Sequence, residues 1–272
     1  PFFSGLFSEK KINLDAEYFT KITSPGGLLL LLLIGMCPYL IRHGLKKHWR
    51  VFGAVIAVVV AVGAWVFTRR LAPPCFVLCV FAGVNLVADF VGRYTRRRSE
   101  SASYSMRWFG SRMVHLGVIL AFVGIAGSSG YDTEEHKAMR PQEKISVAGY
   151  DLVYDDLKAD HGAKHFTAVT ADISVYRDDE LLGKLHPSRA YYSASGQNTS
   201  EVDVRRTLGG DLYLALTNVD SGSRLINLTI MVKPLINWIW IGSIISVIGT
   251  VLVMVALYKR RPGAGQEATT IS

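Results

Sequence analysis

The sequence predicts a polytopic α-helical membrane protein that carries an inserted all-β domain, either a sandwich or a barrel. Half of the 272 residues are apolar, and the mean hydropathy is +0.25. Several apolar runs are 17 to 23 residues long, which is the length needed to cross a hydrocarbon core of about 30 Å. In one segment the hydrophobic period changes to two, as in half-buried strands. So much apolar sequence also excludes intrinsic disorder.

Five apolar runs are predicted to be transmembrane helices, and they divide the chain. The six consecutive leucines of the first run leave no polar face of the kind that a soluble amphipathic helix needs. An outer N-terminal segment, residues 1–24, precedes this run, and a cytoplasmic tail, residues 258–272, follows the last one. The predicted transmembrane helices are 25–41, 51–67, 74–92, 113–130 and 234–257.

The positions of the basic residues predict the orientation. The formal net charge is +8, from 30 Lys and Arg against 22 Asp and Glu. Thirteen of the basic side chains lie in 42–50, 93–112 and 259–261, and 5 lie in the segments predicted on the opposite side. Because short basic loops stay in the cytoplasm, the C-terminus is predicted on the cytoplasmic side of a bacterial inner membrane. The excess charge is therefore expected to meet lipid headgroups, and no nucleic-acid partner is expected.

Residues 131–233 are predicted to form the β domain, on the periplasmic side. This part of the chain carries 12 basic and 16 acidic residues, whereas the rest carries 18 and 6. Apolar residues alternate with polar ones along 169–175 and 226–232, which indicates antiparallel strands with one buried face. Six or seven short strands are expected in all. The further candidates are 144–147, 150–154, 181–185, 201–206 and 211–217.

His115 is the first candidate site residue, because an ionisable side chain inside a membrane span is costly and often functional. Neutral imidazole is a good iron ligand, so His115 is a candidate haem or metal ligand. The alternative is a histidine near the membrane interface that hydrogen-bonds a neighbouring helix. The sequence offers no other metal site.

Asp89 is predicted at a similar depth to His115 and could accept its ring N–H, as carboxylates do around metal-bound imidazoles. The favoured alternative is a local ion pair with Arg93, four residues further on. Arg112 and Asn85 are further candidates for groups around the histidine. Asp89 and His115 would also suit a proton relay, so a proton-coupled transporter subunit is one alternative function.

Trp238 and Trp240 lie at the outer end of the last predicted helix. Tryptophan is enriched at membrane interfaces, so an aromatic belt is the default interpretation. The two rings are also external aromatic candidates for a flat wall against a porphyrin. A non-catalytic assembly or scaffold subunit, which binds partners through its β domain, is a second alternative function.

Several motifs together resemble the C-terminal part of the CcmF/NrfE family of cytochrome c-type biogenesis haem lyases. The resemblance runs across essentially the whole chain, with the motifs in family order. It begins with the apolar helix of residues 18–40. The other motifs are GSRMVHLGVILAFVGIAGSSGY, GYDLVY, HPSRAYYSASGQNTSEVDV, TLGGDLYLAL and VKPLINWIWIG.

The resemblance implies a multi-subunit haem lyase that attaches haem to apocytochrome c at the periplasmic face. It implies that His115 is an axial ligand of haem b in the membrane and that haem is also the substrate. The implied partners are a haem-carrier protein, apocytochrome c and other maturation subunits. The catalytic residues are not identified, and neither the apocytochromes served nor the CcmF or NrfE branch follows from the motifs.

One departure from the family pattern concerns the rest of the haem site. The tryptophan-rich external haem-binding loop, the external histidine pair and the second membrane histidine of the family lie upstream of the matched region. No tryptophan-rich run occurs in these 272 residues. We therefore expect a fragment of a longer protein or the product of a split gene, with the second axial ligand of haem b supplied from upstream.

Overall fold

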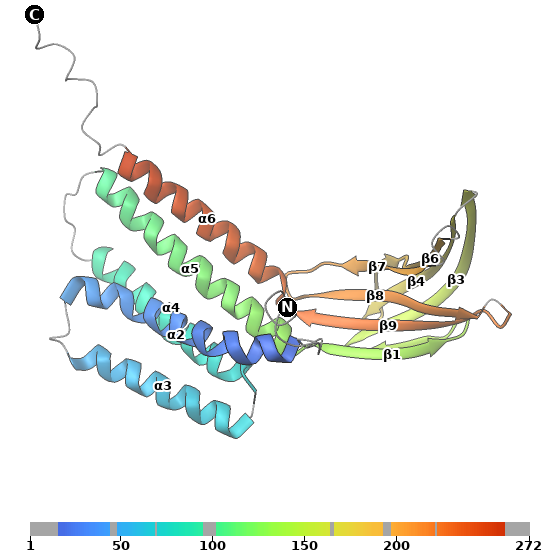
Figure 1. Cartoon of the computed structure of the whole chain (residues 1–272), viewed down its shortest axis with the longest axis horizontal. Coiled ribbons are helices and arrows are strands. Elements are labelled where there is room, and N and C mark those ends of the chain that lie inside the picture. The colour runs from blue at the N-terminus through green and yellow to red at the C-terminus, as the bar shows by residue number, and fades with distance from the viewer. Residues whose placement is uncertain are drawn as a thin grey trace, which may run out of the picture. The chain divides into compact units, whose positions relative to one another are not determined.

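The structure is a computed structural model and consists of two compact units (Figure 1). One unit contains Pro1–Val123 and Gly242–Ser272, and the other contains Gly124–Ile241. Residues 1–15 and 259–272, which include most of the predicted outer segment and nearly all of the predicted tail, lie outside the described residues. The described residues are 16–43, 48–68, 70–94, 102–163, 166–192, 197–220 and 222–258.

Each of the five predicted transmembrane segments lies on a helix. Four of these helices are long and apolar enough to cross a membrane, and within α3 a shorter apolar stretch, Val55–Trp65, is found. The helix α5 begins well before the predicted start at residue 113, so Arg112 is helical rather than part of a basic loop. The helices are α2 (Ala16–His43), α3 (His48–Thr68), α4 (Ala72–Tyr94), α5 (Ala102–Gly130) and α6 (Asn237–Tyr258).

Glycines bring α5 and α6 into backbone contact. A methyl group added to Gly110 would lie 2.7 Å from the carbonyl oxygen of Gly249, and one added to Gly249 would lie 2.6 Å from the carbonyl oxygen of Gly110. Gly117 and Gly242 approach each other equally closely. The pairing order shows that the two helices run antiparallel. Small residues favour such contacts between membrane helices because they let the backbones approach.

Among its described residues, the β domain contains nine antiparallel strands in the order β1-β9-β8-β7-β6-β4-β3-β2, with β5 also paired to β4. All five further candidate segments and both alternating segments are strands. The prediction of six or seven strands missed β1 and β6, because neither sequence shows a clear apolar alternation. The strands are β1 (Thr133–Met139), β2 (Lys144–Val147), β3 (Tyr150–Ala163), β4 (Phe166–Arg177), β5 (Glu180–Leu185), β6 (Ser188–Tyr192), β7 (Gln197–Arg205), β8 (Gly210–Asp220) and β9 (Leu225–Pro234).

Two tight turns set the register of hairpins in this domain. Ala148 and Gly149, between β2 and β3, have φ values of 49° and 80°. Asp178 and Asp179, between β4 and β5, have φ values of 51° and 62°. Positive φ at both central residues is the geometry of a type I′ turn, whose twist matches that of the flanking strands. Glycine and aspartate tolerate this conformation better than other residues.

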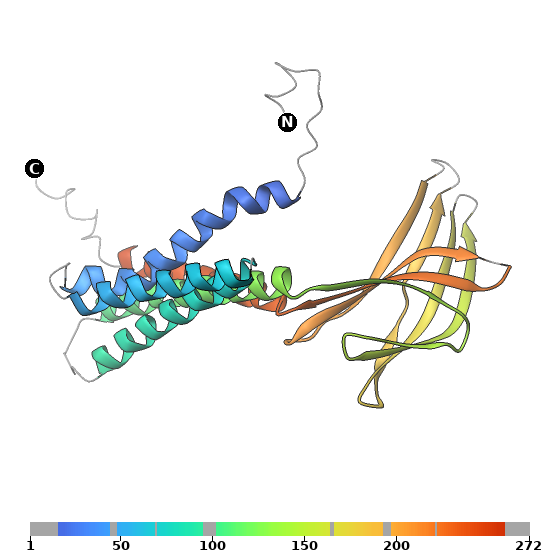
Figure 2. The same ribbon diagram turned by 90° about the horizontal axis from the view of Figure 1, so that it is seen from below.

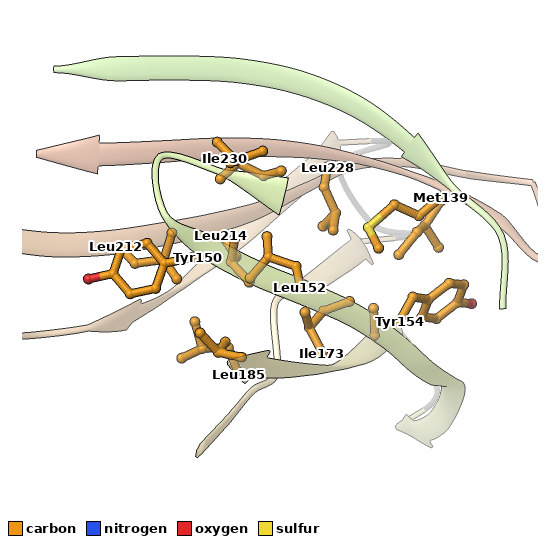
Figure 3. Close-up of a cluster of buried hydrophobic side chains, with 14 of the residues drawn as sticks. Met139, Tyr150, Leu152, Tyr154, Ile173, Leu185, Leu212, Leu214, Leu228 and Ile230 are labelled. Carbon is orange, nitrogen blue, oxygen red and sulfur yellow. The ribbon is translucent and has the colours of Figure 1, made fainter. Parts of the chain in front are cut away.

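The core of the domain is formed by one face of the strands. Ile173 and Val175 of β4 and Ile226 and Ile230 of β9 are completely buried, which confirms the inward face predicted from the alternation. Figure 3 shows Leu152, Leu214 and Leu228 among the core side chains with Ile173. Figure 2 shows that the strands of this domain are strongly curved. The apolar residues that alternate with polar ones along the strands thus form one core inside the sandwich.

Candidate functional site

Asp89 and Arg112 form a buried ion pair between α4 and α5. Arg112 Nε donates to Asp89 Oδ2 at 2.7 Å, and only 4% of the Asp89 side chain and 7% of the Arg112 side chain are exposed. The guanidinium of Arg112 also lies 5.6 Å from the ring centre of Trp108. Breaking a buried pair by removing one partner costs about 3–5 kcal/mol, because the other charge is left without compensation.

Arg93, the predicted partner of Asp89, also contacts α5. Arg93, which lies four residues after Asp89 on α4, donates from Nη2 to Ser105 Oγ of α5 at 3.2 Å. Its guanidinium packs over the ring of Trp108, 4.4 Å from the centre. The local spacing on α4 favoured Arg93, and the long α5 helix brings Arg112 to the carboxylate as well. The sequence could not show this contact because the predicted helix started after Arg112. The Asp89–Arg93 pair stays a prediction.

His115 lies one turn beyond Arg112 on α5 and is partly exposed. Its Nδ1 is buried and has no hydrogen-bond partner. Among the described residues, this nitrogen makes no bond to Asp89, and the predicted contact between Asp89 and the His115 ring stays a prediction. A buried imidazole nitrogen without a partner is uncommon in a folded protein and calls for an explanation such as a bound group.

The residues next to His115 form a narrow interface between α4 and α5. Cys79 Sγ lies 3.9 Å from the carbonyl oxygen of Ile119, and Cys75 Sγ lies 3.8 Å from that of Phe122. Both cysteines are buried, as expected of small apolar fillers. Arg112, His115, Ile119 and Phe122 are spaced three or four apart, so they share one face of α5. That face contacts α4.

Asn85 makes a local contact. Its Nδ2 donates to the carbonyl oxygen of Phe81, one turn earlier on α4, at 2.9 Å. This bond satisfies one donor of the side chain within its own helix. The role of Asn85 around His115 therefore stays a prediction.

An apolar groove of about 670 Å³ lies elsewhere in the helical unit, between α2, α3 and α4. Leu28 of α2, Trp65 of α3 and Leu78 of α4 contribute to its walls. Neither His115 nor Asp89 lines it. The groove is thus separate from the polar residues that form the candidate site.

The outer face of the β sheet carries a polar cluster that the sequence did not reveal. Asp172 of β4 is only 9% exposed and lies 2.6 Å from Lys158 Nζ and 2.9 Å from His186 Nδ1. Asp155 accepts from Ser174 Oγ at 2.5 Å and from Lys184 Nζ at 2.9 Å. The alternating pattern had placed Asp172 and Ser174 on a solvated face, but long side chains from β3 and β5 cover them.

Hydrogen bonds control the protonation of this cluster. The bond from Lys158 holds the pKa of Asp172 below its usual value, and His186 adds to this effect. Burial alone would raise the pKa of Asp155, but the bonds from Ser174 and Lys184 outweigh burial and lower it. Both carboxylates therefore favour the ionised form, and each accepts a bond from one lysine. No group of three or more His, Cys, Asp and Glu side chains is arranged to hold a metal among the described residues.

Trp238 and Trp240 lie in the first turn of α6 and have different surroundings. Trp238 Nε1 donates to the carbonyl oxygen of Leu208 at 3.0 Å. Trp240 is 68% exposed. One ring is therefore fixed by a hydrogen bond, while the other faces outward. Neither the aromatic belt nor the porphyrin wall is decided by these contacts.

Comparison with known proteins identifies the family that this architecture resembles. Residues 130–234 match the sequence model described as the CcmF C-terminal beta-sandwich. The resemblance to the C-terminal part of the CcmF family is thereby confirmed. The match covers β1 to β9 and confirms the sandwich among the two predicted all-β architectures. The helices lie on both sides of the matched region in the sequence.

Relatives of the CcmF family extend the similarity to nearly the whole chain. The cytochrome c-type biogenesis protein ccl1 of Rhodobacter capsulatus is 26% identical over 277 residues, which cover 99% of this chain and 42% of that protein. CycK of Bradyrhizobium diazoefficiens is 28% identical over 268 residues, which cover 93% of this chain and 40% of that protein. The chain therefore spans about two fifths of the length of these relatives.

A solved structure shares the fold. The structure titled "Cytochrome c Heme Lyase CcmF" superposes with a TM-score of 0.69 at 21% identity, covering 93% of this chain and 42% of that chain. This similarity includes the helices as well as the sandwich. Together with the bacterial relatives, the apolar helices indicate an inner-membrane protein.

Proposed function

We propose that this chain is the C-terminal portion of a haem lyase for cytochrome c maturation, with His115 as an axial ligand of haem b. The proposal rests mainly on the Nδ1 atom of His115, which is buried and has no hydrogen-bond partner. His115 lies on a helix that is long and apolar enough to cross a membrane. An iron ligand or a bound polar group would satisfy such an imidazole. The names of the relatives, which are cytochrome c-type biogenesis proteins, support the same conclusion.

The apolar surroundings of His115 fit a porphyrin site, but the nearby carboxylate does not have its usual role beside a haem-ligating histidine. The neighbouring face of α5 offers apolar surface with buried cysteines opposite, as a haem in low dielectric requires. The carboxylate that would normally orient the imidazole is used by Arg112 instead. We propose that the Asp89–Arg112 pair acts as a positioning element that fixes α5 against α4 and thereby fixes the height of His115.

When bound, haem b would supply electrons to the incoming haem and keep its iron reduced. The side chains of this chain have other tasks. His115 would hold the iron, the α4–α5 interface would exclude water, and the ion pair would hold the two helices in register. We propose that the second axial ligand comes from sequence outside these 272 residues, in keeping with the fraction of the relatives that the chain spans.

The β domain is proposed to act as a scaffold or docking surface on the periplasmic side, with the C-terminus in the cytoplasm. The distribution of basic residues, 13 against 5 across the predicted membrane, supports this orientation. Apocytochrome c, a haem-carrier protein and other maturation subunits are the proposed partners. The thioether bonds would form at this face, and no catalytic residue is assigned.

The contacts around Asp89 favour the haem lyase over the proton-relay alternative. A relay needs a carboxylate that can take up a proton and pass it to a neighbour. Asp89 is instead engaged by the guanidinium of Arg112, and in the described structure His115 Nδ1 makes no bond to it. Asp89 thus fits a structural role better than a transporting one.

The proposed function is tested by the amount of haem attached covalently to a c-type cytochrome in cells. His115→Ala should abolish attachment or reduce it at least about tenfold, since an axial ligand of the haem that supplies electrons would be lost. His136→Ala is the matched control, because His136 lies on β1 with an exposed side chain. Attachment at the control level in both variants, with equal amounts of membrane-inserted protein, would contradict the proposal.

A further inference from the structure

The loop between β7 and β8, residues 206–209, is fastened to the beginning of α6. The carbonyl oxygen of Thr207 accepts from Asn237 Nδ2 at 2.7 Å, and that of Leu208 accepts from Trp238 Nε1 at 3.0 Å. The carbonyl oxygen of Gly209 accepts from the backbone N–H of Leu235 at 3.1 Å. Three successive carbonyls of one loop are thus used, and all of these residues belong to the unit Gly124–Ile241.

A buried carboxylate completes this fastening. Asp211, only 2% exposed, accepts from the backbone N–H of Thr207 at 3.0 Å and from Asn237 Nδ2 at 2.7 Å. Because a buried carboxylate must be hydrogen-bonded, Asp211 strongly favours this one loop conformation. The loop is therefore rigid without help from its own apolar side chain.

Leu208 is that side chain, and it is 68% exposed. Its backbone is fixed by Trp238, but its side chain has no part in the hydrophobic core of the domain. A single exposed leucine is common on protein surfaces. Its meaning here therefore depends on the residues around it.

The residues around Leu208 indicate what this side chain contacts. Helix α6 is apolar enough to cross a membrane and begins at Asn237, so its first turn lies at a membrane boundary. Trp240, in the first turn of α6, and Tyr131, just after the end of α5, are 68% and 52% exposed, as in an interfacial aromatic belt. Arg206, the first residue of the loop, is exposed and carries the charge that attracts lipid phosphate.

We propose that residues 206–209 form a membrane-interface anchor, in which Leu208 enters the headgroup region of the bilayer and Arg206 meets lipid phosphate. The bilayer is the occupant because the loop is bonded directly to the first turn of a membrane-crossing helix. A protein could bind residues 206–209 only if these residues were not already in contact with lipid. The anchor sets how the β domain is held at the membrane and does not depend on the haem lyase assignment.

Fluorescence quenching by spin-labelled lipids tests this anchor. The full chain, with Cys37, Cys75 and Cys79 replaced by alanine, would carry Leu208→Cys labelled with an environment-sensitive dye and would be placed in lipid nanodiscs. The control is Tyr191→Cys, since Tyr191 is also an exposed apolar residue at 47%. Its register partner, Asn198, lies toward the opposite end of β7 from the loop.

The anchor predicts that the dye at residue 208 is quenched at least about twofold more than the dye at residue 191. Trp238→Phe keeps an aromatic side chain but removes the N–H that bonds the Leu208 carbonyl, so it should reduce the quenching at residue 208. Arg206→Gln should make that quenching less sensitive to added phosphatidylglycerol. Equal quenching at the two labelled positions, in nanodiscs that hold folded protein, would overturn the proposal.

Discussion

The two units of the molecule manage buried charge in different ways. In the helical unit, Asp89 contacts the buried guanidinium of Arg112 at 2.7 Å, and both side chains are almost fully enclosed. In the β domain, Asp172 is held by Lys158 and His186, whose side chains are 66% and 52% exposed. Water thus shares the charge of the β cluster but has little access to the helical pair.

The two kinds of contact should contribute differently to the stability of the fold. A charge inside a membrane helix must be matched by a specific opposite charge, because the desolvation cost is not repaid otherwise. A charge covered by lysine side chains at a sheet surface keeps part of its hydration. The helical pair should therefore behave as a single unit, whereas the β cluster should respond gradually to substitution and to pH.

The largest effect is expected from breaking the helical pair. Asp89→Ala should destabilise the protein by about 3–5 kcal/mol, because Arg112 would remain buried without a counter-charge. Thermal unfolding in detergent, followed by circular dichroism, measures this change. The double variant Asp89→Leu with Arg112→Met should recover most of the loss. If Asp89→Ala were no less stable than Arg93→Gln, the buried ion pair would not have the structural role proposed for it.

A core deletion in the β domain comes next. Ile173→Ala removes a completely buried side chain and should cost about 2–5 kcal/mol. Leu181, which is 52% exposed on β5, provides the control variant Leu181→Ala. Chemical denaturation of the full chain measures both. Equal losses of stability in the two variants would contradict the assignment of Ile173 to the core.

The contact between α5 and α6 should give a smaller loss. Gly249→Ala would force a methyl group to within 2.6 Å of the carbonyl oxygen of Gly110 and should cost about 1–3 kcal/mol. Gly83→Ala, on α4, meets nothing within 4 Å and should leave stability unchanged or raise it by up to about 1 kcal/mol. Unfolding temperatures in the same detergent compare the two. A stabilising Gly249→Ala would exclude the close helix approach.

The smallest effect concerns the pH dependence of the β cluster. The folded-state pKa of Asp172 is lowered chiefly by Lys158, so its contribution to stability is present above the unfolded pKa of about 3.9. This contribution is lost as the pH falls through the folded-state pKa. Lys158→Met should raise that pKa, so acid unfolding should begin about half a pH unit higher.

The control for the pH prediction is Lys137→Met, because Lys137 pairs with Glu135 on the surface of β1. This variant should leave the acid transition of the full chain in place. Acid titration followed by circular dichroism measures both variants. An unchanged transition in Lys158→Met would show that the Asp172 cluster does not contribute to acid stability.

Sequence patterns predicted the helices and most strands because each depends on local periodicity. The runs of apolar residues marked the membrane helices, and the alternation in β4 and β9 marked the inner face of the sandwich. Strand β1 was missed because only one of its residues, Met139, is fully buried, so it carries no alternating signal. Glycines at 110, 117, 242 and 249 do signal a close helix pair, and this pattern could have been used.

The site was harder to predict because its contacts join distant segments. His115 was found as an ionisable residue in an apolar run, but the partner of Asp89 depended on where α5 begins. Only the three-dimensional structure brings Arg112, 23 residues away, to that carboxylate. The fastening of Leu208 to Trp238 spans 30 residues, and no local pattern encodes it.

The central claim is that His115 holds haem iron, and a reduced-minus-oxidised absorption spectrum of the purified full-length protein tests it most directly. The account predicts a b-type band in the parent protein and in His136→Ala, and loss of that band in His115→Ala. His115→Met should retain a band with a higher midpoint potential, because thioether ligation raises the potential of haem iron. A b-type band that His115→Ala leaves unchanged, or no band in the folded parent protein, would contradict the claim.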